Sequence, residues 1–349
     1  MTTKKLKTAC ICFHNHLKFI FEENDNHYQL KGGEKLKKVF VLGLFLLSIL
    51  SLFIGVNDLM LRALLQGDSE QWLILATTRV PRTLSLILAG GTMSICGLIM
   101  QHLTQNKFVS PTTAGTMDSA RLGILLVMLF LPNASIASRT LAAFLFAFLG
   151  TMFFLGLSRL LPGKDPVFLP LLGVMFGNIV GAIATFFAYQ FQLIQNMSSW
   201  LQGNFSLVTK GNYELLYLTI PLFFIIYFFA YFFTIVGLGE DVAINLGINY
   251  RLTQLVGIGL VAAASGLVLI MVGTVPFLGV IVPNIVSLIY GDHVKQNLWI
   301  TALSGSLFLM ACDILSRIVI APYEVPVSLT VGILGSLIFI YLLVRRNRA

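Results

Sequence analysis

The fold of this chain is decided by residues 252–291, LTQLVGIGLVAAASGLVLIMVGTVPFLGVIVPNIVSLIYG, which contain no Asp, Glu, Lys or Arg. A run this long and apolar belongs in a lipid bilayer, because about 20 apolar residues span the hydrocarbon core. It is too long for one span, and Gly273-Thr274-Val275-Pro276 lies near its middle. Proline removes a backbone hydrogen-bond donor, so we expect two membrane helices that are broken at this point.

Similar uncharged runs recur along the chain, which has 349 residues, of which 57% are hydrophobic and 11% charged. This composition excludes an ordinary soluble globular protein. The runs predict an all-α polytopic membrane protein with about ten transmembrane helices. The predicted spans are Val39–Asn57, Thr83–Asn106, Leu122–Ser138, Thr140–Ser158, Pro166 to about Gln190, Leu215–Leu238, two within Leu252–Gly291, Gln296–Cys312 and Val325–Val344.

The basic residues predict the orientation of these spans. An even number of spans places both termini on one side of the membrane. Eight lysines precede Val39, and Arg345, Arg346 and Arg348 lie at the end of the chain. Cytosolic segments are enriched in Lys and Arg, so we expect both termini in the cytosol. The net charge of +8 follows from this topology, and no basic face interleaved with aromatic residues indicates a nucleic-acid partner.

Residues 1–38 form a polar, lysine-rich cytosolic extension that precedes the transmembrane domain, residues 39–349. The extension contains Cys10, Cys12, His14, His16 and His27. These residues allow two interpretations, a metal site or a dispensable tail, and their spacing matches no standard zinc pattern, which favours the tail. A cleavable signal peptide is not indicated, because the apolar run begins only at Val39 and continues as a full span.

A short polar stretch, GEDVAINLG, separates two of the apolar runs and must therefore lie in water. It begins with acidic residues, carries Ala243 and Leu246 at helical spacing, and ends in a glycine that suits a helix stop. The stretch is either a short amphipathic helix presented to something outside the bilayer or a solvated connector. Its candidate residues are Gly239, Glu240, Asp241, Ala243, Leu246 and Gly247.

Arg79, Arg82 and Arg317 lie at helix ends on the predicted external side. Arginines in such places often extend to lipid phosphates, but they also bind carboxylates of an acidic partner in bidentate fashion. The residues alone leave both interpretations open. Asp313 lies four residues before Arg317, which predicts an i,i+4 ion pair.

Polar residues inside the predicted spans are few. Asp118 and Arg121 are one helical turn apart, and we interpret them as a structural ion pair rather than an ion-coupling site. Glycines recur every four residues in the fifth span, which predicts a flat ridge for close helix packing. Asn178 lies beside this ridge and suits either a transport pathway or a hydrogen bond between helices. The ridge consists of Gly173, Gly177 and Gly181.

Several catalytic motifs are missing from the sequence. It contains no Gly-x-x-x-x-Gly-Lys-Ser/Thr and no His-Glu-x-x-His, so the chain cannot itself bind ATP through a P-loop. It also offers no pair of mid-membrane carboxylates for catalysis and no chain of acids for a proton relay. A membrane-embedded catalytic carboxylate pair is therefore unsupported, and the interpretation as an ion-coupled secondary transporter is weakened.

The motifs that remain resemble those of FecCD-type permeases, which belong to ABC importers of iron-siderophores and vitamin B12. The resemblance covers nearly everything from about Val39 onward. The matching segments occur in the family's order: Arg79–Leu84, Gly97–Gln101, Asn106–Pro111, Gly239–Gly247, Pro276–Pro283, Ala311–Arg317 and Glu324–Val327.

The resemblance implies a BtuC-like fold and a non-enzymatic subunit of a larger assembly. Family members form dimers of ten-helix subunits, with two ATP-binding subunits in the cytosol and a substrate-binding protein docked outside. ATP and Mg would be bound by the ATPase, and no cofactor by this chain. By resemblance, the loop at about 239–250 couples to the ATPase and the three external arginines hold carboxylates of the binding protein. Met175 and Asn178 become candidates for the translocation path.

The sequence departs from the commonest family pattern at Lys107, Asn284 and Ser287. Residues 107–115 are similar to the subset that imports catecholate siderophores, including petrobactin-like ones. We therefore expect a ferric catecholate cargo, a second, non-identical permease as partner, and a place in the bacterial inner membrane. Cobalamin or haem is the alternative cargo, and an ion-coupled secondary transporter is the alternative class.

Overall fold

A computed structural model describes residues 29–54, 68–160, 168–211, 213–320 and 323–346 of the chain. The chain divides into two compact units, residues 1–43 and residues 44–349. The candidate metal-binding Cys and His residues of the N-terminal extension lie outside the described residues. All the sites discussed below belong to the second unit.

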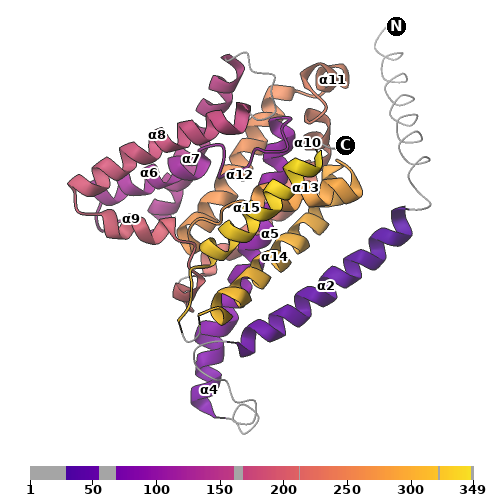
Figure 1. The fold of residues 1–349 in the computed structure, drawn as a ribbon. Helices are drawn as coiled ribbons and strands as arrows, with labels where there is room; N and C mark the ends of the chain where they lie inside the picture. Colours follow the sequence, from indigo (N-terminus) through magenta and orange to yellow (C-terminus); the bar gives the residue numbers. More distant parts are fainter. Residues whose placement is uncertain (1–28, 55–67, 161–167, 212, 321–322, 347–349) are drawn as a thin grey trace. The chain divides into compact units, whose positions relative to one another are not determined.

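The described elements are all helical (Figure 1). They are α2 Gln29–Phe53, α4 Ser69–Ile74, the π-helical turn η1 Leu75–Arg79, α5 Val80–Leu103, α6 Thr116–Phe130, α7 Ile136–Leu160, α8 Phe168–Gln190, α9 Ile194–Leu201, the 3-10 turns η2 Phe205–Leu207 and η3 Glu214–Leu218, α10 Thr219–Val236, α11 Glu240–Asn245, α12 Tyr250–Val272, α13 Leu278–Tyr290, α14 Val294–Ile318 and α15 Val327–Arg346.

Six helical stretches of the described chain are long and apolar enough to cross a membrane. Two shorter apolar helices, Leu278–Tyr290 and Val327–Leu342, accompany them. The protein is therefore an all-helical, multi-pass membrane protein, and the count of ten spans stays a prediction. The six stretches are Ser69–Leu103, Ile136–Ser158, Phe168–Gln190, Glu214–Val236, Tyr250–Val272 and Val294–Ile318.

The helix that contains α5 begins much earlier than the predicted start at Thr83. Helix runs without interruption from Ser69 to Leu103, passing through Pro81. Proline cannot donate to the carbonyl four residues before it, here that of Thr77. A π-helical turn precedes Pro81, and the backbone N–H of Lys210 donates to the Thr77 oxygen at 2.9 Å. A distant segment thus supplies the donor that Pro81 lacks.

The predicted break within residues 252–291 is confirmed. Helix α12 ends at Val272 and α13 begins at Leu278. Gly273 has a φ of +81°, and a Cβ at this position would lie 2.8 Å from the Gln202 carbonyl oxygen. Glycine is therefore required here both by the backbone conformation and by the neighbouring loop.

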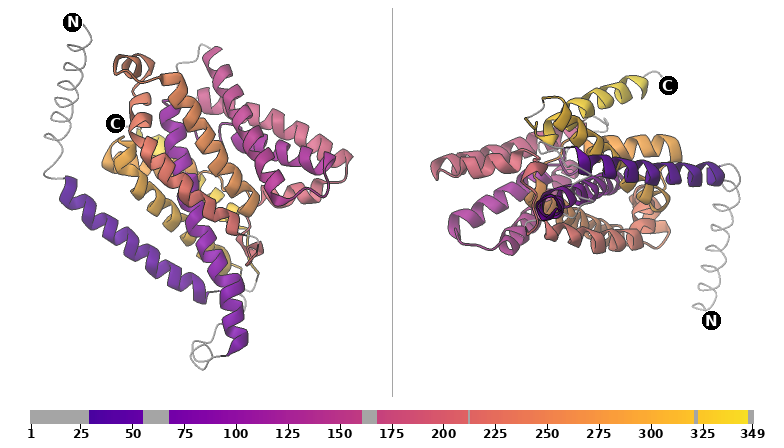
Figure 2. Two further views of the ribbon diagram at one scale, coloured as in Figure 1. Left: turned by 180° about the vertical axis from the view of Figure 1, so that it is seen from behind. Right: turned by 90° about the horizontal axis from the view of Figure 1, so that it is seen from below.

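Helix α5 lies at the centre of the second unit and packs against α10, α12, α13 and α14 (Figures 1 and 2). Its closest approach is to α13, where a Cβ on Gly97 would lie 1.8 Å from the Gly279 carbonyl oxygen. Only glycine lets two backbones come this close. Arg82 and His102 lie at opposite ends of α5, so this helix links the two polar sites described below.

Helices α6 to α9 form a second group beside this centre (Figure 1). The predicted glycine ridge of α8 is confirmed, since a Cβ on Gly173 would lie 2.1 Å from the Thr113 carbonyl oxygen and one on Gly177 2.6 Å from Asp118 Oδ2. The predicted pair of Asp118 and Arg121 is also present, with 2.8 Å between Oδ1 and Nη1. The pair therefore lies on the face of α6 that packs against α8.

Candidate functional site

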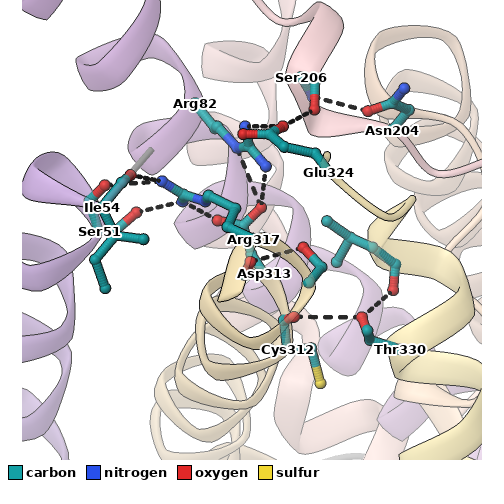
Figure 3. A network of polar contacts seen from close by, with 12 residues as sticks. Ser51, Ile54, Arg82, Asn204, Ser206, Cys312, Asp313, Arg317, Glu324 and Thr330 are labelled. Atoms are coloured by element: carbon teal, nitrogen blue, oxygen red, sulfur yellow. Dashed lines mark hydrogen bonds and ion pairs between the residues drawn. The ribbon is translucent and has the colours of Figure 1, made fainter. Parts of the chain in front are cut away.

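The three arginines singled out in the sequence meet at one end of α5 and α14. Arg82 of α5 donates from Nε and Nη2 to Asp313 Oδ1 of α14, at 3.1 and 2.8 Å. Its Nη1 donates to Glu324 Oε2 at 2.7 Å. Arg317, one turn beyond Asp313, donates to the other carboxylate oxygen, which confirms the predicted i,i+4 pair. Figure 3 shows Asp313 between the two guanidinium groups.

These charges are deeply buried. The side-chain exposure is 0% for Asp313, 1% for Arg317 and 10% for Arg82. A buried charge is tolerated only when it is paired and hydrogen-bonded, because it has lost its hydration. Glu324 is the most exposed member of this set, at 18%. Asp313, Arg317 and Arg82 therefore stabilise the fold, whereas Glu324 is partly accessible to solvent.

Arginine side chains also bind the end of α2, within residues 44–54. Arg317 Nη1 donates to the carbonyl oxygens of Ser51 and Ile54 at 2.9 and 2.7 Å, and Nη2 donates to Ser51 Oγ at 2.7 Å. Arg79 donates to the same Ile54 oxygen. The last carbonyls of a helix lack partners within it and carry partial negative charge, so the two arginines cap α2.

Glu324 connects the arginines to the loop after α9. It accepts a hydrogen bond from the Ser206 hydroxyl as well as from Arg82. Partial burial acts to raise the pKa of the Glu324 carboxyl, but Ser206 and Arg82 outweigh it and hold that pKa below its usual value. A cavity of about 220 Å³ opens here. It is lined by Ile74, Thr78, Arg79, Arg82, Phe205, Ser206, Val208 and Glu324.

Arg79, Arg82 and Arg317 thus lie close together in the structure, but each already has hydrogen-bond partners within this chain. Their guanidinium groups contact carboxylates and carbonyls of this same chain. Sequence reasoning found the Asp313 and Arg317 pair because it is local. It missed the links from Arg82 to Asp313 and Glu324, which no spacing rule signals. Docking of a partner at these arginines stays a prediction.

Of the two alternatives for the polar stretch, a short helix is present as α11, Glu240–Asn245, and Gly247 follows its end with a φ of +76°. The prediction that Ala243 belongs to an exposed apolar face of this helix is wrong. Ala243 is fully buried and belongs to the same hydrophobic cluster as residues of α10 and α12. The apolar side chains that face outward are Val242, Ile244 and Leu246, exposed at 40%, 57% and 39%. A six-residue helix packed between its two neighbours turns a different face outward from the one that spacing suggested.

A second polar cluster lies beside α11, at the other end of α5. Lys107 forms an ion pair with Asp292, and its Nζ lies 2.5 Å from Ser287 Oγ. Asn284 Nδ2 donates to the Lys107 carbonyl oxygen at 2.8 Å. Among the three positions where the sequence departs from the common pattern, Lys107 therefore contacts both Asn284 and Ser287. A cavity of about 160 Å³ adjoins them.

His102 connects this cluster to the end of α10. Its Nδ1 lies 2.8 Å from the Leu98 carbonyl oxygen and its Nε2 2.9 Å from that of Asp292. A Cβ on Gly237 would lie 2.7 Å from the ring, so α10 ends directly against His102. Glu240, the first residue of α11, follows within three positions. The imidazole therefore joins α5, the turn before α14 and the start of the polar loop.

The two candidate path residues lie on the outward face of α8. Met175 is 57% exposed and Asn178 is also exposed, whereas Gly173 and Gly177 on the opposite face are buried. A role of these two residues in lining the translocation path stays a prediction. Among the described residues, no group of three or more His, Cys, Asp or Glu side chains could hold a metal ion.

Comparison with known proteins identifies the family. Residues 41–345 match the FecCD transport family. This chain belongs to that family. It is 50% identical over 313 residues to the petrobactin import system permease protein YclN of Bacillus subtilis, a match that covers 90% of this chain and 99% of YclN. It is 39% identical over 309 residues to the ferric-anguibactin transport system permease protein FatD of Vibrio anguillarum, covering 88% of this chain and 98% of that protein.

A solved structure supports the fold of this FecCD member independently. A metal-chelate type ABC transporter in an inward-facing conformation superposes with a TM-score of 0.72 at 21% identity. The match covers 89% of this chain and 99% of that one. The helical arrangement described above is therefore that of an ABC permease.

Proposed function

We propose that this chain is the permease subunit of an ABC importer that moves a ferric siderophore of the catecholate type into the cytoplasm. The observation that carries the proposal is the 50% identity to the petrobactin permease YclN, which extends over 99% of that protein. Petrobactin, or a siderophore of its class, is therefore the proposed cargo. The family assignment and the ABC transporter fold support the transport mechanism.

The energy for transport comes from partners in this proposal. The sequence has no P-loop, so two separate ATPase subunits bind ATP and Mg. A second, non-identical permease completes the membrane dimer, and an extracytoplasmic binding protein delivers the siderophore. Cargo passes between the two permeases, with Met175 and Asn178 of α8 along its path.

The finer topology is part of the same proposal. Ten helices cross the bacterial inner membrane, and both termini lie in the cytosol. The lysines before Val39 and the arginines at the end of the chain support this orientation. It places α11 and the Lys107 cluster inside the cell and the arginine network outside.

Helix α11 is the proposed contact with the ATPase. It begins with Glu240 and Asp241 and exposes Val242, Ile244 and Leu246, whereas Ala243 anchors it to the rest of the chain. Exposed apolar side chains on a short rigid helix suit a groove on a partner. Closure of the ATPase would then push α11 and, through His102, the ends of α5 and α10.

Purification of the tagged chain from its native membrane, followed by mass spectrometry, tests this assignment. We expect an ATPase subunit and a second, non-identical permease in the preparation. Recovery of an ATPase without a second permease would indicate that the membrane dimer is a homodimer rather than a heterodimer. Recovery of the chain alone, together with transport that needs no ATPase, would contradict the importer and favour an ion-coupled carrier.

A further inference from the structure

Arg82 pairs with two carboxylates that differ in burial and in the number of hydrogen bonds they accept from it. Asp313 accepts from Nε and Nη2 of Arg82, is wholly buried, and also pairs with Arg317. Glu324 accepts only from Nη1 of Arg82 and is 18% exposed. Asp313 therefore fixes the guanidinium in place, and Glu324 adds a second, more accessible partner.

The surroundings of Glu324 allow it to move. It lies in the connection between α14 and α15, whose backbone is held separately by the Val325 N–H on the Ser316 carbonyl oxygen at 3.2 Å. Its remaining side-chain contact is with Ser206, in the loop after α9. Rotation of the Glu324 side chain would break these two contacts and leave the Asp313 pairs intact.

The adjoining cavity is the size of a side chain. Its volume of about 220 Å³ is below the ~300–1,000 Å³ of small-molecule sites, so it does not suit an entire siderophore. Arg79 and Arg82 line it. Arg82 and Arg317 share the two carboxylates, so a carboxylate that replaces Glu324 on Arg82 keeps the charges balanced. The chemistry that fits this cavity is a single carboxylate side chain.

We propose that Glu324 occupies, on Arg82, the position that an acidic side chain of the extracytoplasmic binding protein takes on docking. This inference rests on the proposed function, since it needs a docking partner. The incoming carboxylate replaces Glu324 on Nη1, and the Ser206 contact breaks with it. Glu324 thereby weakens docking and makes it reversible, because every docked state must displace an internal ion pair.

The affinity of the binding protein for Glu324→Gln permease complexes tests the exchange. The probe is the fluorescently labelled binding protein that co-purifies with the complex, titrated against the complete complex in lipid nanodiscs. We expect binding about two- to five-fold tighter than for wild type, the range that a partly exposed ion pair contributes. Glu214→Gln is the matched control, since Glu214 accepts from the backbone of residues 211 and 213 and touches no arginine among its described contacts. Its affinity should equal that of wild type.

Unchanged or weaker binding by Glu324→Gln would overturn the exchange, because Glu324 would then support Arg82 rather than compete with a partner. Absence of binding by wild type and variants alike would overturn the importer assignment as well, which separates the two failures.

Discussion

Arg82 Nη2 lies 2.8 Å from Asp313 Oδ1, although 231 positions separate the two residues in the chain. This buried pair fixes α5 against α14, and these two helices have the most extensive packing of any pair among the described helices. It also orients Arg82 toward Glu324 and the cavity that both residues line. A single carboxylate thus joins the packing of the bundle to the proposed docking surface.

Replacement of Asp313 by asparagine should destabilise the protein severely. The change removes the carboxylate that pairs with Arg317 and leaves Arg82 with Glu324 alone. Breaking a buried ion pair typically costs about 3–5 kcal/mol. Thermal unfolding of the purified chain in detergent would show the loss. Glu324→Gln should lose much less, since Glu324 is partly exposed. Equal losses for the two variants would contradict the division between a fixed and an exchangeable carboxylate.

Replacement of Gly97 by alanine should separate α5 from α13. The new Cβ would lie 1.8 Å from the Gly279 carbonyl oxygen, and backbone cannot move aside cheaply. We expect a loss of several kcal/mol or failure to accumulate in the membrane. Gly156→Ala in α7 is the control, because a Cβ there meets nothing within 4 Å. That variant should be neutral or up to ~1 kcal/mol more stable.

Replacement of Ile244 by aspartate should uncouple ATP hydrolysis from uptake while leaving the fold intact. Ile244 is the most exposed apolar residue of α11, so its loss affects a partner rather than the core. The measurement is ATPase activity and siderophore uptake by the reconstituted complex. Ala243→Asp places a charge in a fully buried site and should instead reduce the amount of folded protein. Normal uptake by the Ile244→Asp variant would show that α11 is not the contact with the ATPase.

The ion pair between Lys107 and Asp292 should persist across neutral pH. Burial acts to raise the pKa of the Asp292 carboxyl, but hydrogen bonds from Lys107 and Ser287 outweigh it, so this pKa lies below its usual value. A lowered pKa contributes stability that is complete above the ordinary value of about 4 and is lost as the pH falls through the folded-state value.

A double-mutant cycle with Lys107→Met and Asp292→Asn measures this coupling by thermal unfolding. Asp292 is largely exposed, so the interaction energy should be below about 1 kcal/mol. It should be constant between about pH 5 and 8 and vanish only in more acidic solution. Loss of the coupling near neutral pH would show that another group controls the contact.

Sequence reasoning predicted the features that depend on neighbouring residues. The apolar runs, the break at Gly273–Pro276, the glycine ridge of α8 and the two ion pairs at i,i+3 and i,i+4 all follow from local spacing. Features that depend on distant segments were missed. The start of the α5 helix depends on a donor from Lys210, and the partners of Arg82 come from α14 and the loop after it.

In the candidate site too, the features that depend on distant segments could not be predicted. Spacing allowed a short helix as one of two alternatives for residues 239–247. It could not predict that Ala243 faces inward, because that depends on how α10 and α12 enclose α11. Arg79, Arg82 and Arg317 were found by their charge. Their internal partners, Asp313 and Glu324, became visible only through packing, and they change what docking at these arginines requires.

The most direct test of the importer assignment is uptake of radioactive iron bound to petrobactin by cells that lack this chain. The account predicts that uptake is abolished, that wild type restores it, and that Ile244→Asp does not. Unchanged uptake of ferric petrobactin in the deletion strain, in the absence of a second petrobactin system, would contradict the proposed cargo. Restored uptake in cells whose ATPase subunit is also deleted would contradict the ABC mechanism itself.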